Sequence, residues 1–376
     1  MQFAFTDEQN LIRESVGTAC EQLCDREDLF KSMEDNDGFH AEAWQTLCAE
    51  MGLGLTAVPE ARGGLGLGTI ELASIMEKMG RTLLPTPFFT SIILSATALI
   101  HGKKTETFNG ILEEVGGGEK VASFAFLDRQ GQNSSASGQA VYREGSLSGD
   151  FGFVQYGSLA DNFIVLAQDG SGAPCLAVID AKADGVHIAP RVSMDMTRPM
   201  SDLSLKDVSI IGGELLTQSS DTIERVFNIA RICLASEQLG ASEAVLEKTQ
   251  AYALERHQFG RAIGSFQAVK HRLADMMVLN EAAKSAAWYA ACAADEMPED
   301  LPVAAATAMV VTSRALKRNS KNMIQLHGGM GFTWECEAHL YLKRAELSSR
   351  YLGAETAHRE TLAAFALGET QPGETP

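Results

Sequence analysis

Hydrophobic residues recur at helical spacing along the first part of the chain, for example at Leu11, Val16, Cys20 and Leu23. Thr6 stands just before this run and Gln9 follows three residues later, which predicts an N-terminal helix cap closed by a capping box. A glycine-rich stretch at residues 58–68 breaks the pattern, and we interpret it as a loop at a helix boundary. The pattern predicts an N-terminal helical domain over residues 1–118.

The hydrophobic period changes in the middle of the chain, between about Lys120 and Gly213. Clusters of Gly, Asn, Ser and Asp there separate short apolar runs, at residues 121–126, 163–167 and 175–179. Short runs bounded by turn-forming residues are typical of antiparallel strands. The sequence therefore predicts a middle antiparallel β domain over residues 119–213.

Helical spacing returns after residue 218 and is kept over a long stretch, from Ile223 to Tyr252. A helix of this length usually belongs to a bundle, so we expect a C-terminal helical bundle over residues 214–367. Residues 368–376 mix proline, glycine and glutamate without an apolar anchor, and we expect a disordered tail there. The predicted fold class is an α+β multidomain protein with helical, β and helical parts in that order.

The chain is strongly acidic. It has 31 Lys and Arg residues against 49 Asp and Glu residues in a total of 376, a formal net charge of −18 at pH 7. Binding to nucleic acid or to an anionic membrane surface needs a cationic surface, so neither partner is expected. Local basic pockets remain compatible with this net charge.

The longest apolar run, residues 88–100, is interrupted by serine and threonine and is shorter than the ~20 residues that a bilayer requires. It predicts a buried helix, and no membrane span is expected. The seven cysteines are an odd number without a Cys-x-x-Cys pair, which favours reduced thiols. The N-terminus lacks the basic start and long apolar stretch of a secretion signal, so a cytoplasmic location is expected.

A first candidate for chemistry is the segment that starts at Arg256. An arginine beside a helix end, followed by Phe259 and Gly260, can offer a charged fork to a pyrophosphate and an aromatic face to a ring. Ordinary helix termination is the alternative, with Gly260 as the left-handed cap. The segment taken alone favours that alternative.

A second candidate is the glycine-containing segment at residues 325–332. Closely spaced glycines let backbone amides approach a ligand that a Cβ would exclude. No strand precedes the segment, so it is not a Rossmann fingerprint, and a tight turn between helices explains it equally well. Cys336 and His339 could share a helical face, but two ligands do not define a metal site, and no metal is expected.

The two segments in this order resemble the acyl-CoA dehydrogenase family, through Arg256-x-Gln258-Phe259-Gly260, Phe266-Gln267 and Gln325-x-His327-Gly328-Gly329-x-Gly331-Phe332. Residues 5–9, 58–66 and 76–80 are also similar to that family, so the resemblance covers nearly the whole chain. It implies an oxidoreductase of lipid metabolism, a flavoprotein that uses FAD to convert an acyl-CoA thioester to a 2-enoyl-CoA. Electrons would pass to an electron-transfer flavoprotein.

The resemblance also implies roles for particular residues. The FAD of a neighbouring subunit would be contacted by Arg256, Gln258, Phe259, Gln267, Gln325, His327, Gly328 and Gly329. Such sharing implies an oligomer, normally a homotetramer built as a dimer of dimers. Arg231 matches an arginine that the family places near the active site, which suggests a substrate-binding role.

The chain departs from the family at the catalytic base. Leu352 occupies the usual glutamate position, Ala230 occupies the alternative one, and Glu355 is only a weak candidate because a solvated glutamate at a helix start explains it better. Residues 127–134 replace the family's flavin segment in the β domain. These departures resemble a divergent branch of heteromeric enzymes acting on sterol side chains.

Three hypotheses follow from the missing base. The protein could be a flavoprotein dehydrogenase in its own right, or a base-less companion subunit in a hetero-oligomer with a related chain. It could also be a non-catalytic acyl-CoA-binding protein that retains only the fold.

Overall fold

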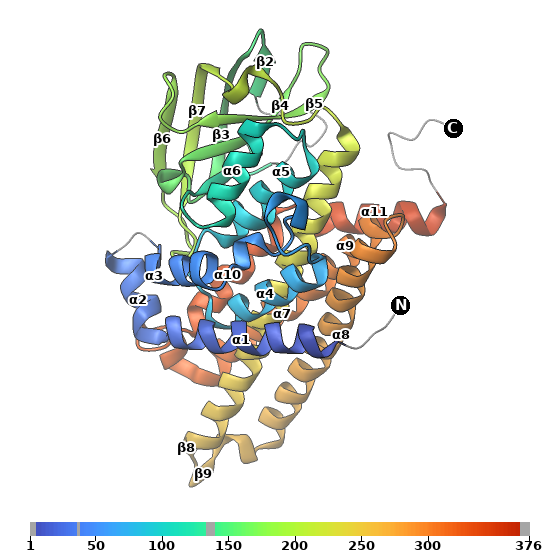
Figure 1. Cartoon of the computed structure of the whole chain (residues 1–376). Coiled ribbons are helices and arrows are strands. Elements are labelled where there is room, and N and C mark those ends of the chain that lie inside the picture. Colours follow the sequence, from blue (N-terminus) through green and yellow to red (C-terminus); the bar gives the residue numbers. More distant parts are fainter. Residues whose placement is uncertain (1–4, 36–37, 133–139, 369–376) are drawn as a thin grey trace. The chain divides into compact units, whose positions relative to one another are not determined.

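The computed structural model of the chain describes residues 5–35, 38–132 and 140–368 (Figure 1). Contacts divide the chain into two compact units, here named the helical unit and the sheet unit. Three stretches of chain form the helical unit, residues 1–27, 69–84 and 231–376. The sheet unit consists of residues 28–68 and 85–230.

The helical unit contains the longest helices, and its C-terminal stretch is almost entirely helical. Its elements are α1 (Asp7–Leu23), α4 (Thr69–Thr82), most of α7 (Ser220–Glu255), β8 (His257–Gln258), β9 (Arg261–Ala262), η7 (Ile263–Ser265), α8 (Gln267–Glu296), α9 (Leu301–His327), η8 (Gly328–Phe332), α10 (Ala338–Tyr351) and α11 (Glu355–Leu367). The single helix α7 spans the whole stretch whose spacing predicted one long helix, so that prediction is confirmed.

The start of α1 follows the capping chemistry predicted from the sequence. The Gln9 backbone N–H donates to Thr6 Oγ1 at 3.2 Å, and the Thr6 N–H donates to Gln9 Oε1 at 3.1 Å. The capping box is therefore confirmed, and it satisfies two N–H groups that a helix start leaves without partners.

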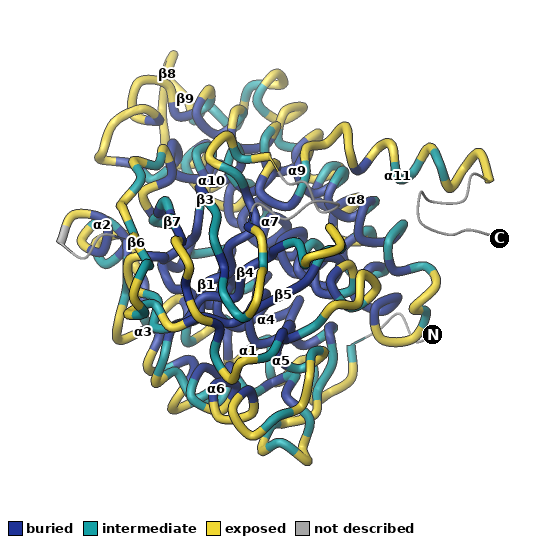
Figure 2. Tube along the Cα trace, turned by 90° about the horizontal axis from the view of Figure 1, so that it is seen from above, coloured by how far each residue is buried: buried dark blue, intermediate teal, exposed yellow. Residues whose placement is uncertain are grey.

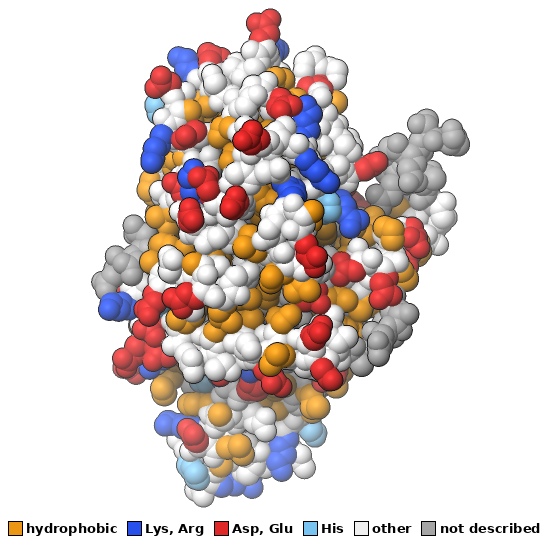
Figure 3. Space-filling model, viewed as in Figure 1, with side chains coloured by type: hydrophobic (Ala, Val, Ile, Leu, Met, Phe, Trp, Pro, Cys, Tyr) orange, Lys and Arg blue, Asp and Glu red, His pale blue; other side chains and the backbone are white. Residues whose placement is uncertain are grey.

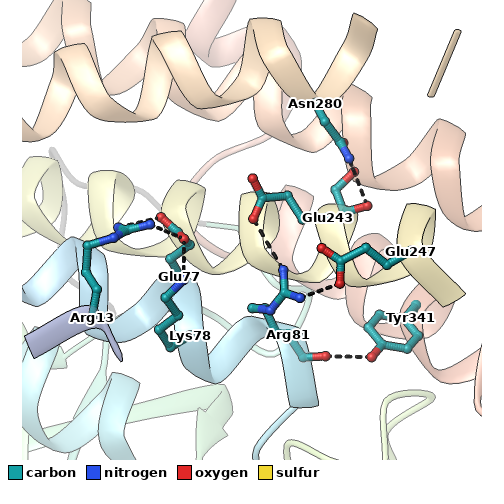
Figure 4. A network of polar contacts seen from close by, with 9 residues as sticks. Arg13, Glu77, Lys78, Arg81, Glu243, Glu247, Asn280 and Tyr341 are labelled. Atoms are coloured by element: carbon teal, nitrogen blue, oxygen red, sulfur yellow. Dashed lines mark hydrogen bonds and ion pairs between the residues drawn. The ribbon is translucent and has the colours of Figure 1, made fainter. Parts of the chain in front are cut away.

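Ion pairs join α1, α4 and α7 inside the helical unit (Figure 4). Arg13 of α1 contacts Glu77 of α4 with an N–O distance of 2.6 Å. Burial raises the pKa of Glu77, but the bonds from Arg13 and Lys78 outweigh burial and lower that pKa overall. The Tyr341 hydroxyl of α10 donates to the backbone oxygen of Arg81 at 2.6 Å. The contacts of Glu77 and Arg81 thus hold α1 and α10 against α4.

The sheet unit contains short helices and all strands of the large sheet. Its helices are most of α2 (Arg26–Asp35), then α3 (Ala41–Gln45), η1 (Thr46–Glu50), η2 (Leu53–Leu55), η3 (Glu60–Arg62), η4 (Phe89–Ala96), α5 (Thr97–His101), α6 (Glu106–Gly116), η5 (Gly157–Leu159) and η6 (Ile211–Gly213). Its strands are β1 (Ala122–Ala125), β2 (Ala140–Arg143), β3 (Ser146–Gln155), β4 (Asn162–Gln168), β5 (Pro174–Asp180), β6 (Val186–Arg191) and β7 (Met200–Ser209).

The sheet runs in the order β1-β4-β2-β3-β7-β6, with β5 paired to β4. Ladders β2–β3, β3–β7, β4–β5 and β6–β7 are antiparallel, whereas β4 is parallel to both β1 and β2. The sheet is therefore mixed rather than purely antiparallel, because β4 pairs with strands that are not its neighbours in sequence. Strands β1, β4 and β5 are buried along almost their whole length (Figure 2).

The apolar run at residues 88–100 forms the buried helices η4 and α5, as the sequence predicts. Its hydroxyl groups bond to the edge of β1: Ser91 Oγ donates to the Ala122 oxygen at 2.8 Å, and the Phe124 N–H donates to Thr90 Oγ1 at 3.0 Å. The polar residues that interrupt this run thus satisfy backbone groups of the sheet. Among the described residues, no helix combines the length and apolarity that crossing a bilayer demands.

The helical, β and helical order predicted from the sequence is confirmed. The domain boundaries at 118/119 and 213/214 stay a prediction, and the expected disordered tail lies almost wholly outside the described residues. All seven cysteines fall within the described ranges and are buried thiols.

Candidate functional site

A small hairpin follows the end of α7 and carries the first candidate segment. Strands β8 and β9 pair antiparallel, with Gln258 opposite Arg261. The two turn residues have positive φ, 54° at Phe259 and 77° at Gly260, as a two-residue hairpin turn requires. Gly260 is therefore left-handed because of the hairpin turn, and it does not cap α7, which ends at Glu255.

The side chains of this hairpin point to solvent. Arg256, Gln258 and Gln267 are exposed, and Phe259 is 92% exposed. Phe259 contacts the Phe266 ring only edge to face, with centroids 6.2 Å apart. This exposure leaves the Phe259 ring free to contact a ligand or a second chain.

The hairpin and the start of α8 form a local basic surface, residues 256–272, here named the basic tip (Figure 3). It contains no Asp or Glu, and its exposed basic side chains are Arg256, His257, Arg261, Lys270, His271 and Arg272. In a chain with a net charge of −18, this concentration of cations favours an anionic ligand.

The second candidate segment begins at the C-terminal end of α9. Gly328 has φ 63° and ψ −137°, a conformation that glycine adopts readily. Cβ atoms built on Gly328 and Gly329 would meet nothing within 4 Å, so both backbones face open space. A Cβ on Gly331 would instead lie 2.9 Å from the Ile324 oxygen. Gly331 thus serves the tight turn, while the first two glycines leave room for a ligand.

Tyr252 and His327 bring the two segments together. Their rings are stacked, with centroids 4.1 Å apart and an interplanar angle of 17°. The Tyr252 hydroxyl donates to the His327 backbone oxygen at 3.3 Å, and His327 Nδ1 lies 2.8 Å from the Met323 oxygen. Burial lowers the pKa of His327, which favours the neutral ring. The end of α7 therefore lies against the end of α9.

The sequence pattern did not single out Tyr252, which it treated only as one apolar position of a long helix. A second contact supports the same arrangement, because Arg272 Nη1 donates to Asn322 Oδ1 at 3.4 Å between α8 and α9. Gln325 is exposed near the same end of α9. The predicted FAD-contacting residues thus gather at one end of the helical unit.

Arg231 and Leu352 also lie together, although 121 residues separate them in sequence. Arg231 Nε donates to the Leu352 backbone oxygen at 3.3 Å. The Leu352 side chain is fully buried, as is that of Ala230. Neither position holds a proton acceptor in its side chain.

Glu355 is the first residue of α11 and is exposed. Its carboxylate pairs with Arg359 one turn later, at an N–O distance of 2.6 Å. His358 differs from it in being 5% exposed and lying beside Gly353. The sequence did not point to His358, because a local pattern of residues does not show that this histidine is buried.

The described part of the segment at residues 127–134 forms a tight turn after β1, and its last two residues lie outside the described ranges. Asp128 Oδ1 accepts hydrogen bonds from the backbone N–H groups of Gln130 and Gln132, each at 2.8 Å. Among the described residues, no cluster of three or more potential metal ligands occurs.

Family models for the acyl-CoA dehydrogenase N-terminal and C-terminal domains match residues 6–106 and 220–367. The acyl-CoA dehydrogenase IpdE2 of Mycolicibacterium smegmatis is 31% identical over 348 residues, which cover 93% of this chain and 95% of that protein. The chain belongs to the acyl-CoA dehydrogenase family.

Two solved structures are similar over nearly the whole chain. A chain of the ChsE4-ChsE5 complex from Mycobacterium tuberculosis has a TM-score of 0.90 and 26% identity, covering 99% of this chain and 100% of that one. A chain of the Tcur3481-Tcur3483 steroid ACAD G363A variant has a TM-score of 0.88 and 28% identity, covering 96% and 98%. The resemblance to a divergent branch of the family is thereby confirmed.

Proposed function

We propose that this protein catalyses the FAD-dependent α,β-dehydrogenation of an acyl-CoA thioester to a 2-enoyl-CoA and passes electrons to an electron-transfer flavoprotein. The observation that carries the proposal is the stacking of Tyr252 on His327, because it places the basic tip beside the open glycine backbone of η8. Family membership supplies the reaction class.

The residues present fit FAD. Its pyrophosphate is anionic and matches the exposed Arg256 guanidinium, and the space beside Gly328 and Gly329, where a Cβ would meet nothing, leaves room for it. Phe259 presents an aromatic face, and Gln258, Gln267 and Gln325 present exposed amide groups. When bound, FAD would accept the hydride that leaves the β carbon of the substrate.

Because these groups point outward, the FAD they hold would belong to a neighbouring subunit, so we propose an oligomer, either a homotetramer or a hetero-oligomer with a related chain. Arg231 would act on the substrate side. Its bond to the Leu352 backbone oxygen would hold the turn between α10 and α11 beside the thioester.

A companion-subunit role is the second candidate function. It is favoured by Leu352 and Ala230, which leave both usual base positions without a proton acceptor. Two similar solved structures carry paired protein names, ChsE4-ChsE5 and Tcur3481-Tcur3483, and the second is called a steroid ACAD. These names support testing steroid-derived acyl-CoA substrates and a partner chain.

The test is anaerobic reduction of the flavin in the purified full-length chain, alone and co-expressed with a related chain. A panel of straight, branched and steroid-derived acyl-CoA thioesters should bleach the flavin absorbance with at least one member. Bleaching only with the related chain present would select the companion role. A protein that binds acyl-CoA but takes up no flavin in either preparation would contradict dehydrogenation and favour a binding protein.

A further inference from the structure

His358 lies next to the position where the family's glutamate is missing. It belongs to the first turns of α11 and is 5% exposed. Its Cε1 and Nε2 atoms lie 3.2 and 3.3 Å from the point where a Cβ on Gly353 would stand. Gly353 has φ 117°, a conformation suited to glycine, and it directly follows Leu352. The imidazole therefore packs against the turn that carries the base position.

The Nε2 atom of His358 is buried and has no hydrogen-bond partner among the described residues. Buried polar atoms in folded proteins nearly always have a partner, so such an atom needs an explanation. One explanation is that the Nε2 lone pair of His358 accepts a proton from a bound substrate.

The surroundings favour the neutral imidazole. Burial lowers the pKa of His358 to about 4, and the Arg231 guanidinium lowers it further in the same direction, while the Gly353 backbone opposes them. A hydrogen bond from the other ring nitrogen to the Gly353 backbone would leave Nε2 as the unprotonated nitrogen. This is the state that a general base needs at neutral pH.

We infer that His358 replaces the missing glutamate as the group that removes the α proton of the acyl-CoA substrate. The inference rests on the proposed function. The α C–H bond breaks and its proton bonds to Nε2, which gives an imidazolium. The electron pair of that bond stays on the substrate as a thioester enolate. FAD, when bound, would supply the oxidant that takes up the hydride of the β carbon. Release of the Nε2 proton to solvent restores the base.

Proton removal can be measured apart from dehydrogenation. An acyl-CoA with sulfur in place of its β carbon has no β hydride to lose, but its α protons can still exchange with D2O. NMR of this probe with the flavin-loaded full-length protein, with a related chain if flavin uptake needs one, reports the base directly. We expect exchange with the wild-type protein and at least 100-fold slower exchange with His358→Gln, while flavin content and probe affinity stay unchanged.

Two variants make the result specific. His187→Gln, at an exposed histidine of β6, is the matched control and should exchange the probe like the wild type. Leu352→Glu added to His358→Gln restores a carboxylate at the family position and should recover exchange. If His358→Gln fails to fold, His358→Asn replaces it, with the same expected loss and the same recovery by Leu352→Glu.

The outcomes separate this inference from the proposed function. Unchanged exchange in a folded His358 variant overturns the inference. Binding of flavin and probe without exchange in the wild type also overturns it and selects the companion role. A wild-type protein that takes up neither flavin nor probe, alone or with a related chain, rejects the proposed function and the inference together.

Discussion

A Cβ on Gly240 of α7 would stand 1.8 Å from the Glu77 backbone oxygen of α4, so the two helices touch backbone to backbone at this point. The contact is reciprocal, because a Cβ on Gly80 of α4 would stand 2.1 Å from the Glu237 oxygen of α7. Each glutamate precedes the glycine of its own helix by three residues. The crossing depends on two glycines that face each other's helix.

Both glutamates of this crossing form ion pairs with arginines of other helices. Glu77 pairs with Arg13 at 2.6 Å, and Glu237 pairs with Arg344 of α10 at 2.6 Å in a site where the two side chains are only 4% and 1% exposed. Removing one partner of a buried ion pair leaves an uncompensated charge. The close crossing and the two ion pairs therefore support one another.

Gly240→Ala should lower the free energy of unfolding by about 3 kcal/mol, because α4 and α7 must separate to admit the methyl group. Urea unfolding followed by circular dichroism measures this difference. Gly110→Ala in α6 is the matched control, since a Cβ there meets nothing within 4 Å. Alanine is the better helix former, so this control should gain about 0.5–1 kcal/mol. Equal stability of the two variants would contradict the close crossing.

Tyr252→Ala should weaken FAD binding at least tenfold, because the glycine loop of η8 loses the ring that stacks on His327. Tyr252→Phe keeps the ring and loses only a hydrogen bond of 3.3 Å, so it should bind FAD within about threefold of the wild type. Fluorescence titration of the flavin-free protein with FAD gives both affinities. Similar losses in the two variants would assign the effect to the hydroxyl instead of the stack.

The features that the sequence could predict are those that depend on residues close together in the chain. The cap at Thr6 and Gln9 lies within four residues, and the long α7 repeats one hydrophobic period, so both are visible in short windows. The direction in which β4 pairs with β1 and β2 is a tertiary property. The apolar runs identify the strands but carry no signal of which strand lies beside which.

The residues of the candidate site likewise fall into those that a local motif reveals and those that only tertiary contacts bring together. The exposed Arg256 and the open glycines could be found because motif residues sit close together in the chain. The contacts of Tyr252 with His327 and of Arg231 with Leu352 join residues 75 and 121 positions apart. His358 acquires its distinctive setting only through burial against Gly353, which depends on how α11 starts.

Arg256→Gln should reduce FAD affinity about 10- to 100-fold, because a charge-assisted bond to the pyrophosphate contributes roughly 1.5–3 kcal/mol. The wild-type affinity should also fall more steeply with salt than that of the variant. Arg143→Gln, at an exposed arginine of β2 in the sheet unit, is the matched control and should leave FAD affinity unchanged. Equal losses in both variants would point to a general effect of net charge.

His358 should make the stability of the wild-type protein depend on pH in a defined window. Burial and the nearby Arg231 lower its pKa to about 4 in the folded protein, against an ordinary value of 6.5 when the chain is unfolded. Between these values only the unfolded chain binds the proton, so the free energy of unfolding falls as the pH drops from about 6.5 to about 4. The fall amounts to about 3 kcal/mol and is absent above pH 7.

Urea unfolding of the wild type and of His358→Gln at pH 7.5 and 4.5 measures this fall in the free energy of unfolding, because the two proteins share all other titrating groups. A difference between the two proteins that stays constant with pH would show that the pKa of His358 is the same in the folded and in the unfolded chain.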